Sequence, residues 1–572
     1  MYMRRFCFIV SLLLSLTALA QQERRIPVLR AQFQDCTFSI SEEAFLDMLQ
    51  RAGCYFTEQH AGKVQFIFDP GPVITLGSDV ARYGHNSTSS KDELLYKAVQ
   101  ETCFASESAI DFKSYDSDND NIVDNVCILF AGASESGADN PDLIWSQQNR
   151  LSALDAPIYI GGKRIDSFSV SAEADSLGTF CHEYAHALGL PDFYDTDGEG
   201  SGGLSEAFWG RLSLMDAGNL NRNGTLPPNF NAVELDLLGL GQCENLSLGS
   251  WTLQPLSREQ RYIKAETDND REYFLFECRD NSGWDEGIEG NGLLIYHIDR
   301  SDSNTGYSDY YRIPLTASQR WQRSEINCRP DHQCADLCEA DSGTGDISMV
   351  FFPCRTHTSF GSDTHPAFRS WSGKGSNLTI AGIVRNPDGS ISFTVVEPVI
   401  IQEVVSYQDA AIIKWETDEA IGRTSGAEIS WVSETGQADT LKVGSGTVCC
   451  TLEHLKPGTT YKAEVKVFDA NGEAYSVSTS FKTKIWREEL QPYIYLGSAE
   501  RSENGHIVRG SRIPLRVYNV PDAEEVIWTL DGRRIGTGPD GYYTIDKGGI
   551  LKAQVLHTDG STDILIKKLE LE

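Results

Sequence analysis

The chain has 572 residues, more than one hydrophobic core usually serves, so two to four domains are expected. Its hydrophobic and charged fractions, 40% and 23%, are those of globular proteins and exclude a disordered or membrane-embedded chain. The formal net charge of -33 argues against nucleic-acid partners, because a phosphate-binding protein needs a basic surface. The acidic excess fits a solvated surface, and part of it is a candidate for holding calcium.

The first twenty residues have the features of a signal peptide. Arg4 and Arg5 precede a short apolar stretch that closes on Ala-Leu-Ala at 18–20, an A-x-A cleavage site. Cys7 lies inside this stretch and not at the cleavage point, so no lipid anchor is indicated. No later apolar run is long enough to cross a bilayer. We therefore expect residues 1–20 to be removed from an exported protein, secreted or at the cell surface, without a transmembrane segment.

Thirteen of the fourteen cysteines follow the signal peptide. In an exported protein some of them should pair, and Cys328, Cys334, Cys338 and Cys354 are the best candidates for a disulfide group because they crowd one stretch. A zinc knuckle is the alternative, although the spacing lacks paired C-x-x-C units.

The first two thirds of the chain alternate between strand-like and helix-like segments and then become β-rich. Strands are expected at 25–35, 63–69 and 125–132, and helices at 39–52, 92–102 and 175–190. The first helix carries Ser39 and Glu42 at capping-box spacing. After about Leu240 only short strands are expected, at 271–279, 292–299 and 389–398. This pattern predicts an α/β domain over 21–245 and a β-rich subdomain over 246–398.

The last third of the chain consists of short strands with turn signals. Trp415 suits a sandwich core, and Tyr461 follows a Pro-Gly-Thr-Thr turn at the head of an alternating strand. These features resemble a fibronectin type III module over 399–486, which implies a β-sandwich. Alternating runs in 487–572 predict a second, immunoglobulin-like β-sandwich.

The stretch "FCHEYAHALGLPDFYD" carries the strongest chemical signal. If 175–190 is helical, with Asp175 or Ser176 as its cap, His182 and His186 lie one turn apart on one face and can share a Zn²⁺ ion. Glu183 is placed to take a proton from a water molecule and to pass it to the leaving amine. The plainer alternative for such a pair is two histidines in a packed core.

The residues that follow favour the metal site. Gly189 can end the helix in a left-handed turn, and Asp192 then returns as a third, oxygen ligand. Three protein ligands leave a fourth position open, as in catalytic zinc sites. The pattern H-E-x-x-H-x-x-G-x-x-D resembles the metzincin consensus with aspartate in place of the last histidine, and Met215, in a turn-rich setting, is the candidate for its methionine turn.

Three segments together resemble a known family. "HEYAHALGLPDFYDT", "WGRLSLMDAGN" and "DSGWDEGIEGNGLLIYHID" are similar to the immune inhibitor A peptidases, secreted bacterial metalloproteases, and the resemblance runs from Arg25 to Pro398. It implies a metzincin-like endopeptidase that cleaves proteins. It also implies roles for individual residues: zinc ligands His182, His186 and Asp192, acid/base Glu183, and the supporting turn at Met215. Family members commonly carry an inhibitory propeptide, whereas here the signal peptide runs almost directly into the first strand.

A second candidate metal site precedes the active helix. The loop "YDSDNDNIVDNV" places carboxylates at Asp116, Asp118, Asp120 and Asp124, in the manner of a calcium loop. It is not an EF-hand, because Asn121 stands where a glycine makes the sharp turn. The alternative is a solvated acidic loop, but four like charges in nine residues repel one another without a cation, which favours calcium.

Five further residues are weaker candidates. Glu173 and Asp175 precede the active helix and are expected to orient it or the substrate. Tyr194 is a candidate hydrogen-bond donor to the oxyanion, with packing beside the metal as the alternative. His297 and Asp299 are expected to serve the β-rich subdomain.

The sequence therefore predicts a multidomain, secreted zinc endopeptidase with protein or peptide substrates, Zn²⁺ and Ca²⁺ as cofactors, and two appended sandwiches that offer cell-surface or matrix contact. A surface adhesin or matrix-binding protein that keeps the peptidase domain as a scaffold is the alternative. The presence of Glu183 beside the complete ligand set favours the enzyme. A calcium-dependent sugar-binding module ranks last, because residues 399–572 show no cluster of aromatic or acidic residues typical of a sugar site.

Overall fold

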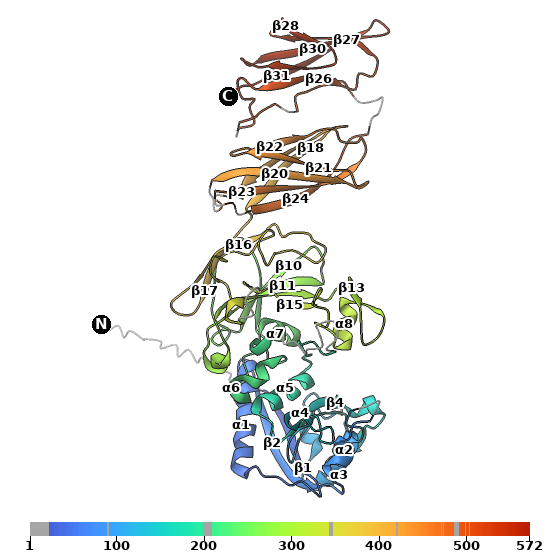
Figure 1. Cartoon of the computed structure of the whole chain (residues 1–572), viewed down its shortest axis with the longest axis vertical. Coiled ribbons are helices and arrows are strands. Elements are labelled where there is room, and N and C mark those ends of the chain that lie inside the picture. Colours follow the sequence, from blue (N-terminus) through green and yellow to red (C-terminus); the bar gives the residue numbers. More distant parts are fainter. Residues whose placement is uncertain are drawn as a thin grey trace, which may run out of the picture.

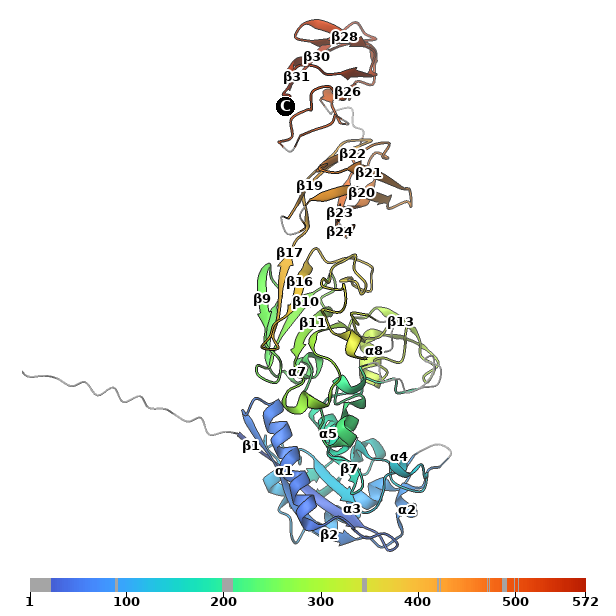
Figure 2. The same cartoon turned by 60° about the vertical axis from the view of Figure 1, so that its left-hand side comes forward.

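The computed structural model describes residues 22–87, 91–197, 209–341, 347–418, 421, 423–470, 472, 474–485, 491–497, 499–502 and 504–572. The predicted signal peptide at 1–20 lies outside this part. Figures 1 and 2 show an extended molecule, with the N-terminal α/β part at one end and the C-terminal strands at the other. Within the described residues, no helix is both long enough and apolar enough to span a membrane.

The first sheet is mostly parallel. In order across the sheet its strands are β2 (Val64–Thr75), β1 (Gln22–Gln32), β3 (Val126–Phe130), β7 (Ser167–Ala172) and β4 (Gln147–Arg150). The first four strands run parallel, and β4 pairs antiparallel with β7 at the edge. All five residues of β3 are buried, as expected for a central parallel strand with both faces covered.

Helices cover both faces of this sheet. On one face α1 (Glu42–Gln59) and α5 (Leu177–Leu188) pack in the same core as Ile26 and Val28 of β1. On the other face α3 (Leu95–Ser106) packs in a core with Leu29 and Ala31 of the same strand. This change of face along β1 is the alternation of side chains that a strand imposes.

The cap predicted for α1 is wrong. The helix begins at Glu42 with Ser41 as its N-cap, and the Ser41 hydroxyl accepts a hydrogen bond from Ala44 N. The backbone N–H of Ser39 instead donates to Glu173, 2.8 Å away. A tertiary contact therefore overrides the local capping signal.

A second, mixed sheet follows, in the predicted β-rich region. Its strands in order are β15 (Ala335–Leu337), β12 (Gly292–Asp299), β11 (Glu272–Arg279), β10 (Arg261–Glu266) and β8 (Gln242–Asn245). One face, which includes Tyr273 and Leu275, joins the core that contains α1 and α5. The other, which includes Phe274 and Phe276, packs against a third sheet of β16 (Thr379–Arg385), β17 (Ile391–Val396) and β9 (Gly249–Leu253).

Shorter elements complete this part of the chain. Two hairpins form, β5 (Ile158–Ile160) with β6 (Lys163–Ile165), and β13 (Asn304–Tyr307) with β14 (Pro314–Thr316). The remaining α-helices are α2 (Val80–Gly84), α4 (Glu135–Ala138), α6 (Asn221–Gly224), α7 (Ala232–Leu238) and α8 (Ala317–Arg323). The 3-10 helices are η1 (Phe112–Tyr115), η2 (Leu151–Leu154), η3 (Gly210–Leu212), η4 (Ala217–Leu220), η5 (Gly283–Gly287) and η6 (Ile347–Val350).

The next pair of sheets shares one core. It comprises β18 (Val399–Ser406), β19 (Ala411–Thr417) and β22 (Cys449–Leu452), and, in the second sheet, β21 (Ala438–Gly444), β20 (Thr424–Ser433), β23 (Thr460–Asp469) and β24 (Ala474–Lys482). Trp415 is 1% exposed and lies in this core, as predicted. Tyr461 is buried at the head of β23, also as predicted.

The last pair of sheets has the same plan. It comprises β25 (Tyr493–Tyr495), β26 (Arg512–Tyr518) and β29 (Asp540–Thr544), and, in the second sheet, β28 (Arg533–Thr537), β27 (Ala523–Leu530), β30 (Gly549–His557) and β31 (Thr562–Leu569). Leu515, Trp528 and Ala553 are buried in its core.

Direct side-chain contacts join the successive parts. Asp363, in the loops before β16, forms an ion pair of 2.8 Å with Lys466 of β23. The buried amide of Gln408 donates to Asn519 at 2.5 Å, which joins the loop after β18 to the residue after β26. The polypeptide linkers are therefore not the only connections between these parts.

The expectation of a disulfide group at residues 328–354 is wrong, because all thirteen cysteines in the described part of the chain are free. Cys334 packs in the core with α1 and α5, whereas Cys338 and Cys354 pack in the core on the opposite face of the second sheet. These cysteines are buried and behave as small apolar side chains.

Candidate active site

Helix α5 begins and ends where the sequence predicts. Of the two candidate caps, Ser176 is the one used, and its hydroxyl accepts from the backbone N–H of Thr179 at 3.4 Å. Gly189 closes the helix with a φ of 109°, a left-handed conformation that other residues resist. The chain can therefore turn back directly after the second histidine.

This reversal brings the three predicted metal ligands together. Nε2 of His182 lies 3.2 Å from Oδ1 of Asp192, and Nε2 of His186 lies 3.3 Å from the same atom. The ligand atoms of all three residues lie within 4.8 Å of one another. His182 is 7% exposed, so the first ligand is buried and not on an open surface.

Hydrogen bonds on the far side of each imidazole set the tautomers. Nδ1 of His182 lies 2.9 Å from the carbonyl oxygen of Leu214, and Nδ1 of His186 lies 2.7 Å from that of Leu190. A carbonyl oxygen only accepts, so each Nδ1 carries a proton, and in the neutral imidazole each Nε2 presents a lone pair.

The donor set therefore fits a divalent cation. Oδ1 of Asp192 is buried and accepts no hydrogen bond, although two imidazole nitrogens face it. Three lone pairs that converge without a proton between them repel one another unless a cation joins them. Two imidazole nitrogens and one carboxylate oxygen are a ligand set typical of catalytic zinc.

Glu183 stands beside the first ligand and is 7% exposed. Burial raises the pKa of its carboxyl to about 7, although the charges of His182 and His186 act in the opposite direction. A carboxyl group whose pKa lies near neutrality can both accept and return a proton, which is the property that general acid–base catalysis needs.

Met215 is fully buried in a turn that contacts both parts of the ligand set. The preceding carbonyl, of Leu214, holds the first histidine. The Met215 carbonyl accepts from the backbone N–H of Phe193, next to Asp192, at 2.9 Å. This turn therefore fixes the position of the helix and of the returning loop at once.

Two carboxylates that support this turn were not singled out from the sequence. Glu234 is buried, and its Oε1 accepts from the Ser213 hydroxyl at 2.6 Å and from Met215 N at 3.3 Å. It also forms a capping box with Asn231 at the start of α7, and the Asn-x-x-Glu spacing was a readable signal. Asp216 accepts from the backbone N–H of Trp209 at 2.9 Å.

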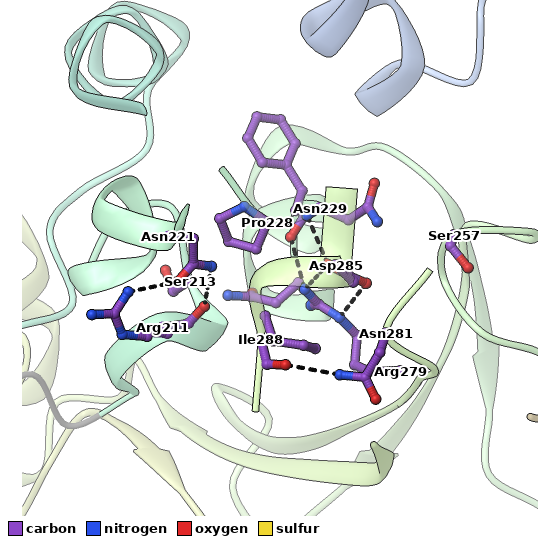
Figure 3. Close-up of polar contacts among 12 residues, drawn as sticks. Arg211, Ser213, Asn221, Pro228, Asn229, Ser257, Arg279, Asn281, Asp285 and Ile288 are labelled. Carbon is purple, nitrogen blue, oxygen red and sulfur yellow. Dashed lines mark hydrogen bonds and ion pairs between the residues drawn. The ribbon is translucent and has the colours of Figure 1, made fainter. Parts of the chain in front are cut away.

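A buried ionic network is centred on Arg279 and Asp285 (Figure 3). Arg279 is fully buried and donates through Nε and Nη2 to Asp285, at 2.8 and 2.6 Å. Its Nη1 lies 3.1 Å from Glu277, and Asp285 also accepts from the backbone N–H of Asn229 at 2.9 Å. The network joins β11, η5 and the segment before α7, so the second sheet is tied to the part of the chain that carries the turn.

The acidic loop is only partly assembled as predicted. Carboxylate oxygens of Asp116, Asp118 and Asp120 lie within 4.8 Å of one another, but Asp124 is not in this group. Asp124 instead lies 3.2 Å from Nε of Arg24.

Positive charge is also present at the acidic loop. Nζ of Lys163 lies 2.5 Å from Asp116. The repulsion between the aspartates of the loop is therefore reduced by this lysine even without a bound cation. Asn121 takes a φ of 71°, which explains how the sharp turn forms without glycine.

The weaker candidates have structural partners. Glu173 accepts from the backbone N–H groups of Ser39, Ile40 and Gly132, and Asp175 accepts from the hydroxyls of Ser134 and Ser146. Both carboxylates therefore hold the loops around the start of α5.

Tyr194 donates a hydrogen bond to Asp192, and burial, followed by the charges of Asp192 and Glu183, holds its pKa well above the usual range. His297 pairs with Glu272 at 2.8 Å, and Asp299 with His332 at 2.8 Å. Both of these ion pairs belong to the β-rich region, as predicted.

Comparison with known proteins identifies the α/β part. Residues 30–239 match the family model "Immune inhibitor A peptidase M6, catalytic domain". The chain is 27% identical over 213 residues to Immune inhibitor A of Bacillus thuringiensis subsp. alesti, covering 31% of this chain and 30% of the relative. It is 26% identical over 290 residues to Pre-pro-metalloprotease PrtV of Vibrio cholerae serotype O1 (strain M66-2), covering 44% and 30%. The chain thus spans about 30% of the length of the curated relatives that it matches.

By these matches, residues 30–239 are similar to the catalytic domains of metallopeptidases. The family that they match is the immune inhibitor A peptidases, peptidase M6, and the resemblance predicted from the sequence is confirmed. Among solved structures, the fibronectin type III domain of the human collagen alpha-1(XX) chain is 19% identical, with a TM-score of 0.14, and covers 16% of this chain and 83% of that domain.

Proposed function

We propose that this chain is a zinc-dependent endopeptidase that hydrolyses peptide bonds of extracellular proteins. The observation that carries the proposal is the convergence of two imidazole lone pairs on an unpartnered, buried oxygen of Asp192, directly beside the buried carboxyl of Glu183. The family of the catalytic domain supports the same conclusion.

In this proposal His182, His186 and Asp192 hold the metal. When bound, zinc supplies a Lewis acid that polarises water and the scissile carbonyl. Glu183 accepts the proton of the attacking water and returns it to the leaving nitrogen, and its raised pKa suits both steps. Asp192 is held in place by the turn at Met215 and by Tyr194, so it does not have to reorganise during the reaction.

The proposed architecture follows the predicted boundaries. Residues 21–245 form a metzincin-like catalytic core and 246–398 its β-rich subdomain, after a signal peptide at 1–20 that directs export. Residues 399–486 and 487–572 form two β-sandwiches, the first of fibronectin type III type and the second immunoglobulin-like. Support for the sandwiches comes from the two sheets around each core and from the Tyr461 hydroxyl, which accepts from the backbone N–H of Lys456 at 2.8 Å across a strand-entry turn.

Calcium binding by the acidic loop is also part of the proposal. Asp116, Asp118 and Asp120 are the ligands that the geometry supports best. Lys163 would have to leave Asp116 for a cation to enter. The affinity of the loop for calcium is therefore reduced by the free energy of this ion pair.

Digestion of casein by the purified full chain tests the proposed function. We expect cleavage that stops when zinc is removed by 1,10-phenanthroline and returns when zinc is added back. A chain that holds zinc but cleaves no protein, and that binds matrix proteins tightly, would favour the adhesin instead.

A further inference from the structure

The hairpin of β13 and β14 gathers exposed aromatic and aliphatic side chains. Tyr307, Tyr310, Tyr311 and Ile313 are 46%, 72%, 39% and 43% exposed. The rings of Tyr310 and Tyr311 meet edge to face at 4.9 Å, and the guanidinium carbon of Arg323 lies 4.4 Å from the centre of the Tyr311 ring. Single exposed apolar residues are ordinary, but four within residues 307–313 form a patch.

This hairpin is held rigidly from below. Arg320 of α8 is fully buried and donates to the Thr305 hydroxyl at 2.6 Å and to the carbonyl oxygen of Gly306 at 3.3 Å. It also pairs with the buried Glu325 at 3.0 Å, and Glu325 in turn accepts from the Ser308 hydroxyl at 2.8 Å. The buried ion pair therefore anchors β13 and Ser308, so less conformational entropy is lost when the hairpin binds a partner than if its base were free.

The same support is joined to the metal-ligand loop. The carbonyl of Ser324, directly after α8, accepts from the Thr196 hydroxyl at 2.5 Å. Asn327 donates to the carbonyl oxygen of Phe193, next to Asp192, at 2.8 Å. In both views the hairpin and α8 lie above α5 (Figures 1 and 2). The helix that supports the hairpin is therefore packed, through the residues that follow it, against the loop that carries Asp192.

The charge of this region differs from that of the whole chain. Of the three arginines in residues 304–323, Arg320 is buried and neutralised by Glu325. Arg312 and Arg323 remain against Asp309, an excess of one positive charge, whereas the chain carries a formal net charge of -33. Arg312, at the tip beside Tyr310 and Tyr311, is exposed. Tyrosine and arginine are the residue types that most often dominate binding at protein interfaces.

We propose that this hairpin is an exosite for protein substrates. It binds an extended substrate segment, outside the residues that flank the cleaved bond, whose apolar side chains cover the tyrosines and whose carboxylates meet Arg312. The inference rests on the proposed peptidase function and adds a substrate preference to it: long, unfolded, acidic polypeptides are cleaved more efficiently than short peptides.

The test compares two substrates and two double variants of the full chain. Casein is the long acidic probe, and a library of octapeptides is the short probe. The test variant is Tyr310→Ser/Arg312→Glu. The matched control is Tyr542→Ser/Arg512→Glu, which removes a tyrosine 48% exposed and an arginine 4.3 Å from its ring in the C-terminal sheets.

For Tyr310→Ser/Arg312→Glu we expect kcat/KM on casein to fall about tenfold through a higher KM, as truncation of central interface residues does elsewhere. Octapeptide cleavage and the control variant should be unchanged.

Equal casein kinetics in the test variant and the wild type would overturn the exosite. An equal loss on casein and octapeptides would also overturn it, because the hairpin would then support the active site itself. Sedimentation that shows a wild-type dimer and a monomeric test variant would assign the patch to self-association instead. A wild type that cleaves neither probe would refute the proposed peptidase function, a result distinct from the other three.

Discussion

Replacing Asp285 by alanine should destabilise the peptidase unit strongly. The change removes the acceptor of two hydrogen bonds that the fully buried Arg279 donates, at 2.6 and 2.8 Å, and of the one that Asn229 N donates. Burial lowers the pKa of Arg279, but the charges of Asp285 and Glu277 outweigh burial and raise it, so this guanidinium is ionised in the fold. Breaking a buried pair by removing one partner costs about 3–5 kcal/mol.

Calorimetry of the full chain measures this effect. At about 2 °C per kcal/mol for a unit of this size, the transition of the peptidase unit should fall by about 6–10 °C. The matched control is Asp331→Ala, which removes a similar two-point contact, 3.1 and 3.2 Å, between Arg329 and a carboxylate whose side chain is 71% exposed. An exposed pair contributes at most about 1 kcal/mol, so the control should shift by about 2 °C or less. Equal shifts in the two variants would refute the reasoning.

Three further predictions concern the metals and the supporting turn. His186→Ala should lose the tightly bound zinc, since it removes one of three protein ligands, and elemental analysis that finds full zinc in this variant would exclude the site. Calcium should raise the Tm of the wild type but not of Asp116→Asn/Asp120→Asn, and an equal rise in both would leave the loop as a solvated turn. Burial raises the pKa of Asp216 to about 7. The stability contributed by its protonated form is therefore complete below the unfolded pKa of about 3.9 and is lost as the pH rises through 7. Asp216→Asn should flatten the profile of Tm against pH between these values, and an unchanged slope would contradict the assignment.

Features encoded over a few residues could be predicted from the sequence. The placement of His182 and His186 on one face follows from helical spacing. Gly189 permits the left-handed turn that brings Asp192 back to the histidines only six residues after His186. The burial of Trp415 also follows from a local alternating pattern. In each of these cases the determining residues are neighbours in the chain.

Features that depend on distant partners could not be predicted. Lys163 and Arg24 reach the acidic loop from separate strands, so the repulsion between its aspartates was overestimated. The Arg279 network also joins separate segments, which no local pattern reveals. The cysteines illustrate the same limit, since crowding in sequence did not show that Cys334 and Cys338 would pack in different cores.

The central claim is that Glu183 acts as the acid/base of a zinc peptidase. The most direct measurement compares casein cleavage by the wild type and by Glu183→Ala at matched zinc occupancy. Because the carboxylate is not in the ligand group, zinc content should be unchanged in the variant, whereas cleavage should fall by at least about 10²-fold, the usual contribution of a positioned proton acceptor. Equal cleavage by the two proteins at equal zinc would contradict the assignment of Glu183.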